Sequence, residues 1–120
     1  MTADATHTVV VIPARNEAAR IGTCLAALAA QATRDVAVVV VANNCEDATA
    51  AIARDVAARD GLRIAVLPVR LTGGAGVGTA RRLGCDHAIA LFADATVLLC
   101  TDADCRVAPD WIARNRHHLR

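Results

Sequence analysis

The chain has 120 residues, of which 55% are hydrophobic, and its formal net charge is +1. This length favours a single domain, and the near-neutral charge gives no general electrostatic reason to bind nucleic acid or a membrane surface. All 13 basic residues are arginines, which excludes mechanisms that need a lysine, such as Walker-type phosphate loops and Schiff-base chemistry. The longest apolar run, residues 36–42, is far too short to form a transmembrane segment.

The five cysteines form an odd-numbered set without a Cys-x-x-Cys pair. No secretory signal precedes them, so we expect reduced thiols and a cytoplasmic protein. The spacing of Cys100 and Cys105 from His117 and His118 fits no standard zinc site.

Four apolar segments predict buried strands that alternate with helices. The expected strands cover residues 8–13, 36–41, 62–69 and 97–101, and the expected helices cover 17–31, 48–59, 77–93 and a last segment whose first residue is Pro109. The first two strands are apolar without interruption, which is typical of strands buried on both faces of a parallel sheet. Pro68 indicates that the third strand lies at an edge or is ending. The alternation predicts an α/β domain with a mostly parallel sheet and flanking helices.

Several residues between these elements carry local structural signals. Asn16 and Asp47 precede the first and second expected helices, where Asn and Asp are favoured as N-caps. Asn44 lies in the loop after the second strand, and we expect it to adopt a left-handed backbone conformation, which asparagine tolerates.

Polar residues follow the strands at the sheet edge where α/β proteins bind their ligands. They occupy positions 15–17, 43–44 and 102–104, and a glycine-rich segment leads to Arg81 and Arg82. Asp102 and Asp104, two residues apart after a strand, can converge on one Mg²⁺ or Mn²⁺ ion. Taken singly, each group also has an ordinary explanation as a helix cap, a turn or a solvated helix face.

Together, four motifs in this order resemble those of family 2 glycosyltransferases, which have the GT-A nucleotide-diphospho-sugar fold. Residues 11–17 (VIPARNE) resemble the family's opening VIPAYNE, and residues 43–49 (NNCEDAT) resemble its DGSTDGT. Residues 76–84 (GVGTARRLG) resemble its GxxxARNxG, and residues 102–104 match its DxD motif. The resemblance implies a Rossmann-like GT-A fold truncated after the DxD helix, so that residues 1–120 form one partial nucleotide-sugar-binding domain.

The resemblance also implies roles for the matching residues. It assigns the binding of Mn²⁺ or Mg²⁺ to Asp104 together with Asp102. It assigns donor-nucleotide binding to Pro13, Ala14, Arg15, Glu17, Asn43, Arg81 and Asp102. Arg15 stands where an aromatic residue often stacks on the base, and a guanidinium can stack as well. Asn43 stands where aspartate is usual, and its amide both donates and accepts hydrogen bonds. The identity of the base is therefore left open.

The implied activity is metal-assisted transfer of a sugar, with inversion, from a nucleotide-diphosphate sugar to a hydroxyl of a saccharide or lipid-linked acceptor. In the family the catalytic base lies beyond the DxD helix, so we do not expect it within these residues. One alternative is a non-catalytic fragment that binds a nucleotide-sugar. Another is a sugar nucleotidyltransferase, although residues 13–15 replace the glycine-rich loop usual in that class. Peripheral attachment to the inner face of a membrane is also open.

Overall fold

A computed structural model of the chain describes residues 6–31, 35–74 and 76–119. They form a parallel four-stranded sheet in the order β3-β2-β1-β4. The strands are β1 (Thr8–Ala14), β2 (Val36–Asn43), β3 (Arg63–Val69) and β4 (Val97–Cys100), and the helices are α1 (Ile21–Gln31), α2 (Thr49–Asp60), α3 (Val77–Leu91) and α4 (Trp111–His118). The α/β alternation predicted from the sequence is confirmed. In the described part of the chain, no helix has the length and apolar character to cross a membrane.

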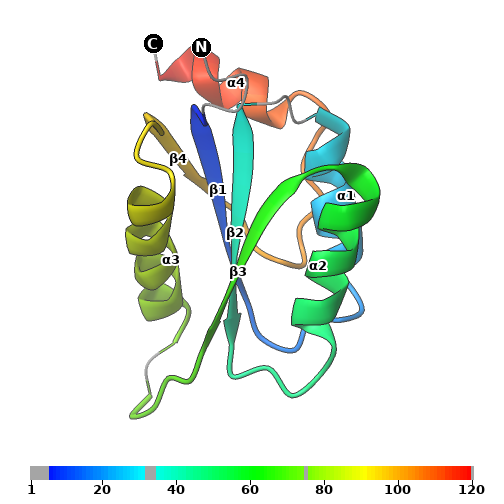
Figure 1. The fold of residues 1–120 in the computed structure, drawn as a ribbon, viewed down its shortest axis with the longest axis vertical. Helices are drawn as coiled ribbons and strands as arrows, with labels where there is room; N and C mark the ends of the chain where they lie inside the picture. Colours follow the sequence, from blue (N-terminus) through cyan, green and yellow to red (C-terminus); the bar gives the residue numbers. More distant parts are fainter. Residues whose placement is uncertain (1–5, 32–34, 75, 120) are drawn as a thin grey trace.

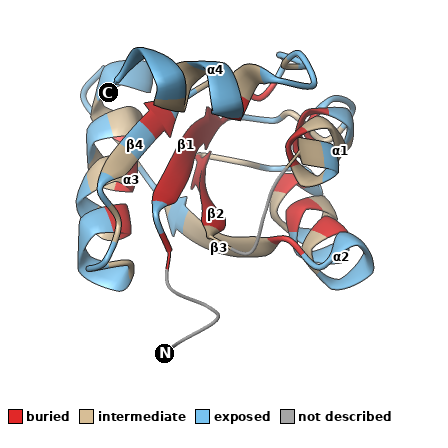
Figure 2. Ribbon diagram, turned by 90° about the horizontal axis from the view of Figure 1, so that it is seen from above, coloured by how far each residue is buried: buried red, intermediate tan, exposed pale blue. Residues whose placement is uncertain are grey.

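The sheet lies between two helical layers, with α1 and α2 on one face and α3 on the other (Figure 1). Strands β1 and β2 are buried at every position, as the red ribbon in Figure 2 shows. Successive residues point to opposite faces, so each strand contributes to both layers. Val10, Ile12, Val38 and Val40 belong to the core on the α1 and α2 side, and Val9, Val11, Val39 and Val41 belong to the core under α3.

Strands β3 and β4 form the two edges of the sheet. The edge position that Pro68 predicted for the third strand is therefore confirmed. On the other side, β4 pairs with β1 only from Thr8 to Val11. The carboxyl end of β1 thus extends past β4, which leaves space beside it.

Helix α4 lies across the amino ends of the strands (Figure 1). Arg116 Nε donates a hydrogen bond to Thr8 Oγ1 at 2.9 Å, and Arg116 Nη2 lies 3.2 Å from Asp35 Oδ1. At the other end of the helix, the Ile112 N–H donates to Gln31 Oε1 at 2.8 Å. These contacts fix α4 at the end of the sheet opposite to the loops that carry the predicted site.

Two helix starts differ from the sequence-based prediction. The first helix begins at Ile21, after a turn over residues 18–20. Asn16 has a positive φ of 52°, and its Oδ1 accepts a hydrogen bond from the Glu46 N–H at 2.8 Å. Asn16 is therefore not an N-cap. The last helix begins at Trp111, whose N–H donates to Ala108 O at 3.0 Å, so Pro109 lies in the turn before it.

The loop after β2 follows the prediction more closely. Asn44 has the expected left-handed conformation, with φ at 51°. The N-cap position of α2 is Ala48 rather than Asp47, but Asp47 Oδ1 accepts a hydrogen bond from the Thr49 N–H at 3.1 Å. Asp47 therefore satisfies a free N–H of the first turn, as a cap would.

Candidate functional site

A pocket of about 370 Å³ opens at the carboxyl ends of β1, β2 and β4. Its lining consists of Pro13, Ala14, Arg15, Glu17, Asn43, Val77, Arg81, Asp102, Ala103 and Asp104. All eight residues expected from the sequence to bind a donor or a metal are thus brought together, although they come from four separate segments. Their individual roles stay predictions.

The end of β1 places Pro13 on the open side of the sheet. The carbonyl of Val11 accepts a hydrogen bond from the Thr101 N–H at 3.2 Å, so Val11 directs its backbone groups toward β4. Pro13, two residues later, points the same way, where β4 has already ended. The lack of an N–H group on Pro13 therefore costs no hydrogen bond between strands. Its ring borders the pocket.

The loop after β1 is held against the loop that leads into α2. The Glu17 N–H donates to Thr49 Oγ1 at 3.0 Å, and the Ala18 N–H donates to Asp47 Oδ2 at 3.1 Å. The Thr49 hydroxyl in turn donates to Asp47 Oδ1. This last hydrogen bond, together with those from the Ala18 and Thr49 N–H groups, lowers the pKa of the Asp47 carboxyl. The two loops thus form one hydrogen-bonded unit on this side of the pocket.

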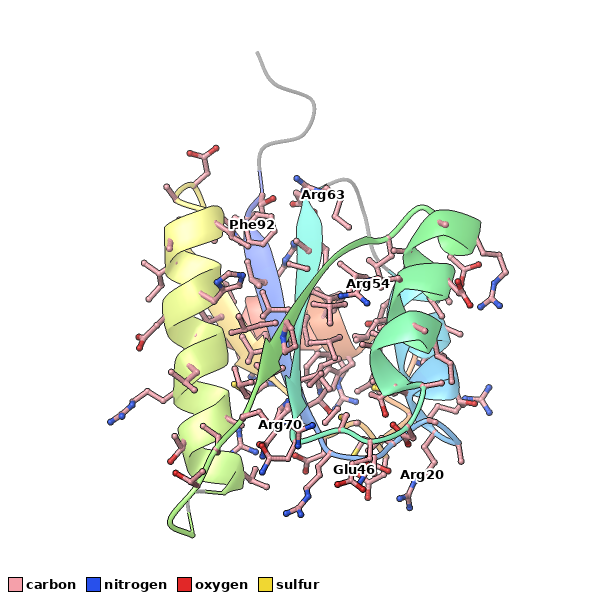
Figure 3. The ribbon with its side chains drawn as sticks, turned by 60° about the horizontal axis from the view of Figure 1, so that its bottom comes forward. Arg20, Glu46, Arg54, Arg63, Arg70 and Phe92 are labelled. Carbon is pink, nitrogen blue, oxygen red and sulfur yellow. The ribbon has the colours of Figure 1, made fainter. Side chains whose placement is uncertain are left out.

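Arg15 and Glu17 present opposite charges at the pocket. Arg15 is exposed, whereas the Glu17 side chain is only 16% exposed and its Oε1 lies 2.5 Å from Arg20 Nη2. Figure 3 brings this end of the molecule forward, with Arg20 and Glu46 at the same edge. Arg20 offsets part of the Glu17 charge, while Arg15 stays open to a ligand.

Asn43 is the last residue of β2 and is 6% exposed. Its Oδ1 is buried and has no hydrogen-bond partner among the described residues, although the residue lines the pocket. Buried polar atoms in native proteins are nearly always paired. Asn43 therefore contributes an acceptor without a described protein partner to the residues around the pocket.

Arg81 lies on α3 and crosses to the turn after β4. Its Nη2 lies 3.3 Å from Asp102 Oδ1, in an ion pair that is partly open to solvent. Its Nε is buried and, within the described part of the chain, has no hydrogen-bond partner. Asp102 therefore orients the guanidinium, which keeps N–H groups available for an anionic ligand.

The turn after β4 fixes the two aspartates. The Cys105 N–H donates to Asp102 O at 3.0 Å, and Ala103 between the aspartates is 2% exposed. From α1, Cys24 Sγ donates to the same Asp102 carbonyl at 3.6 Å. Burial, aided by neighbouring acidic groups, raises the pKa of the Cys24 thiol to about 12, so it keeps the proton that this hydrogen bond needs. The turn is thereby anchored to the core while both carboxylates face solvent.

The carboxylates of Asp102 and Asp104 can meet on one cation, because their oxygen atoms lie within 4.8 Å of each other. The pocket lining holds two arginines and three carboxylates, a formal charge of −1. Such a pocket repels a diphosphate unless a cation changes the balance. Oxygen donors of this kind suit Mg²⁺ and Mn²⁺.

Sequence reasoning missed two lining residues, Val77 and Ala103. Ala103 could have been found from its place between the aspartates, whereas Val77 carries no signal beyond starting α3. Arg82 is exposed and does not line the pocket. His117 and His118 lie on α4, at the opposite end of the sheet (Figure 1).

Solved structures share this fold. Residues 1–349 of TarS from S. aureus align with a TM-score of 0.79 and 22% identity, over 95% of this chain and 32% of that 1–349 chain. The same TarS chain in complex with UDP-GlcNAc aligns with a TM-score of 0.78 and 22% identity, over 95% of this chain and 31% of that chain. The mannosyltransferase PcManGT from Pyrobaculum calidifontis, in complex with GDP-Man and Mn²⁺, aligns with a TM-score of 0.70 and 28% identity, over 89% of this chain and 30% of that chain. This chain thus spans about a third of the length of these solved chains.

None of the curated protein sequences matches the chain significantly. The family described as glycosyl transferase family 2, in contrast, matches residues 9–116, which include all the strands except Thr8 of β1 and all the residues of the pocket. The order of the four motifs and the pocket that they form agree with this match. The chain therefore belongs to glycosyl transferase family 2.

Proposed function

We propose that this chain is the donor-binding part of a glycosyltransferase that transfers a sugar from a nucleotide-diphosphate sugar to an acceptor hydroxyl, with inversion and with the assistance of a divalent metal. The observation that carries the proposal is the pocket at the carboxyl edge of the sheet. It combines a buried acceptor on Asn43 and a buried N–H on Arg81, neither with a partner in the described part of the chain, and two carboxylates on one turn.

The pocket residues divide into a base-binding side and a diphosphate-binding side. Pro13, Ala14 and Arg15 form the wall for the nucleobase, with Asn43 accepting a hydrogen bond from the base or ribose. Arg81 binds the diphosphate or the sugar, since Asp102 holds its guanidinium in place. Glu17 completes the donor site through the loop that Thr49 fixes.

Asp104, with Asp102, would hold Mn²⁺ or Mg²⁺. A cation bound there neutralises negative charge on the diphosphate as it leaves. The formal charge of −1 in the empty lining supports this assignment, because the carboxylates by themselves disfavour a diphosphate. The complexes of structural neighbours with UDP-GlcNAc, with UDP, and with GDP-Man and Mn²⁺ support a nucleotide-sugar donor.

The acceptor in this proposal is a saccharide or a lipid-linked hydroxyl compound. Inverting transfer needs a base that removes the hydroxyl proton. The carboxylates in the pocket lining are Glu17, Asp102 and Asp104, and the first is paired with Arg20. We assign the other two to the diphosphate and the metal, so the base comes from outside the described pocket.

We further propose a cytoplasmic location, which suits five free cysteines that include the exposed Cys100 and Cys105.

The test is calorimetric titration of the chain with UDP and GDP, each with and without Mn²⁺. We expect binding that requires the metal and prefers one base. Replacement Asp104→Asn should weaken metal-dependent binding at least about tenfold, as expected for loss of a metal ligand. The matched control is Asp94→Asn, because Asp94 is also exposed but lies in the turn between α3 and β4.

Equal binding by wild type and Asp104→Asn would remove Asp104 from the site. If a chain that is folded by circular dichroism binds neither nucleotide under any condition, the proposed function is wrong. Binding of a nucleotide-sugar with no transfer and no hydrolysis would instead favour the non-catalytic binding fragment.

A further inference from the structure

The turn after β4 places a thiol beside the two carboxylates. Its closing hydrogen bond, from the Cys105 N–H to Asp102 O, folds residue 105 back toward residue 102. Cys105 Sγ lies 3.7 Å from Asp104 Oδ1. One donor atom from each of Asp102, Asp104 and Cys105 lies within 4.8 Å of the other two, and all three residues are exposed.

These separations suit three ligands of one cation. Zinc binds thiolate sulfur at about 2.3 Å and carboxylate oxygen at about 2.0–2.2 Å in a tetrahedral arrangement, so its donor atoms lie about 3.4–3.6 Å apart. The three exposed side chains, whose donor atoms lie within 4.8 Å of one another, reach that spacing by rotation. Among the described residues, no other cysteine joins an acidic cluster of this kind.

An independent feature shows that this pocket is built for a ligand. Asn43 is 6% exposed, lines the pocket, and carries a buried Oδ1 that has no hydrogen-bond partner among the described residues. The same pocket is lined by Asp102 and Asp104. The two carboxylates therefore line a polar pocket, and the Cys105 thiol lies beside them.

We propose that Cys105 is a third protein ligand of the cation held by Asp102 and Asp104, and that its thiolate shifts the preference of the site from Mg²⁺ toward Zn²⁺ or Co²⁺. The inference rests on the proposed function, because it adds a ligand to the metal site assigned there. Thiolates favour these borderline ions, whereas an all-oxygen site suits Mg²⁺. The Cys105 thiol releases its proton to solvent when the metal–sulfur bond forms.

The test is a Co²⁺ titration of the chain without nucleotide, followed by absorption spectroscopy. A bound thiolate gives a sulfur-to-cobalt charge-transfer band, which carboxylate ligands do not give. We expect wild type to develop this band and saturate at one Co²⁺ per chain. Cys105→Ser should lose the band and bind Co²⁺ at least about tenfold more weakly, with Mg²⁺ affinity nearly unchanged.

Two further variants locate the site. Asp104→Asn should also lose the band, since it removes a ligand of the same ion. Cys100→Ser should keep it, because Cys100 is an exposed thiol on the same segment but outside the cluster. Circular dichroism of each variant checks the fold. A band that disappears in Cys100→Ser and survives in Cys105→Ser overturns the proposal, as does a wild-type titration without any band.

Nucleotide titrations separate this inference from the proposed function. If UDP or GDP binds with a metal, and Cys105→Ser keeps the wild-type ratio of Co²⁺ to Mg²⁺ affinity, the inference is wrong and the donor site stands. If the charge-transfer band depends on Cys105 but no nucleotide binds to the folded chain, the cation site stands and the proposed function is wrong.

Discussion

Gly84 of α3 lies directly against Val11 of β1. A Cβ atom at position 84 would be 2.5 Å from Val11 Cγ1 and 2.7 Å from Val41 Cγ2, closer than real Cβ atoms approach other atoms. The helix can lie this near the sheet only because the residue has no side chain. Arg81, one turn earlier on α3, is thereby brought to the pocket.

The replacement Gly84→Ala should therefore lower the free energy of unfolding by about 1–3 kcal/mol, since an added methyl group strains a packed core. Gly78→Ala is the matched control on the same helix, because none of the described residues has an atom within 4 Å of its added Cβ. It should raise stability by up to about 1 kcal/mol through helix propensity. Urea denaturation measures both, and equal stabilities for the two variants would contradict the packing argument.

Asn44 joins the loop after β2 to the segment after β3. Its Oδ1 accepts the Leu71 N–H at 2.8 Å, and its Nδ2 donates to Leu71 O at 2.9 Å. Asn44→Gly keeps the left-handed backbone but loses both bonds, which should cost about 1–2 kcal/mol. Asn44→Ala should cost about 1 kcal/mol more, because its Cβ disfavours a positive φ. Thermal melting would rank the three proteins, and a glycine variant as stable as wild type would refute the role of the hydrogen bonds.

Asn43 provides a test that separates binding from folding. Its Oδ1 is buried and has no partner within the described residues, so Asn43→Leu should leave the free energy of unfolding unchanged or higher. The same variant should bind its nucleotide at least about tenfold more weakly, because a hydrogen bond made only with the ligand is lost. Denaturation and calorimetric titration of one sample measure the two effects. A large loss of stability would show that Asn43 supports the fold instead.

Cys24 should make stability fall at alkaline pH. In the folded protein the pKa of its thiol is about 12, raised by burial from an ordinary value of 9.0, and the protonated form is therefore favoured by folding. Its contribution is fully present below pH 9 and is lost as the pH rises from 9 toward 12. Denaturation midpoints measured up to about pH 11 should decline less steeply in Cys24→Ala than in wild type. Parallel declines would contradict this account.

The strands were the most predictable part of the fold. Residues such as Val10 and Val39 lie in unbroken apolar runs, and such runs have few alternatives to a strand buried on both faces. Pro68 marked an edge strand correctly, because a missing N–H is tolerated there. Both signals are local: one is the apolar character of adjacent residues, and the other is the missing N–H of a single proline.

Errors arose where the controlling contact is distant in the sequence. Asn16 looks like a helix cap by its position, but its side chain accepts a hydrogen bond from Glu46, 30 residues later. The support of the aspartate turn by Cys24 crosses 78 residues. In contrast, the gathering of the eight candidate residues into one pocket could be foreseen, since parallel strands bring their carboxyl ends to one edge.

The docking of α4 at the amino ends of the strands decides what intrinsic fluorescence can report. The chain has one tryptophan and no tyrosine, and Trp111 is the first residue of α4, packed against the core beside α1. Its emission will follow the release of this helix during unfolding. A nucleotide entering the pocket at the opposite edge should leave the emission unchanged, so the chain contains a built-in reporter of folding that does not respond to its ligand.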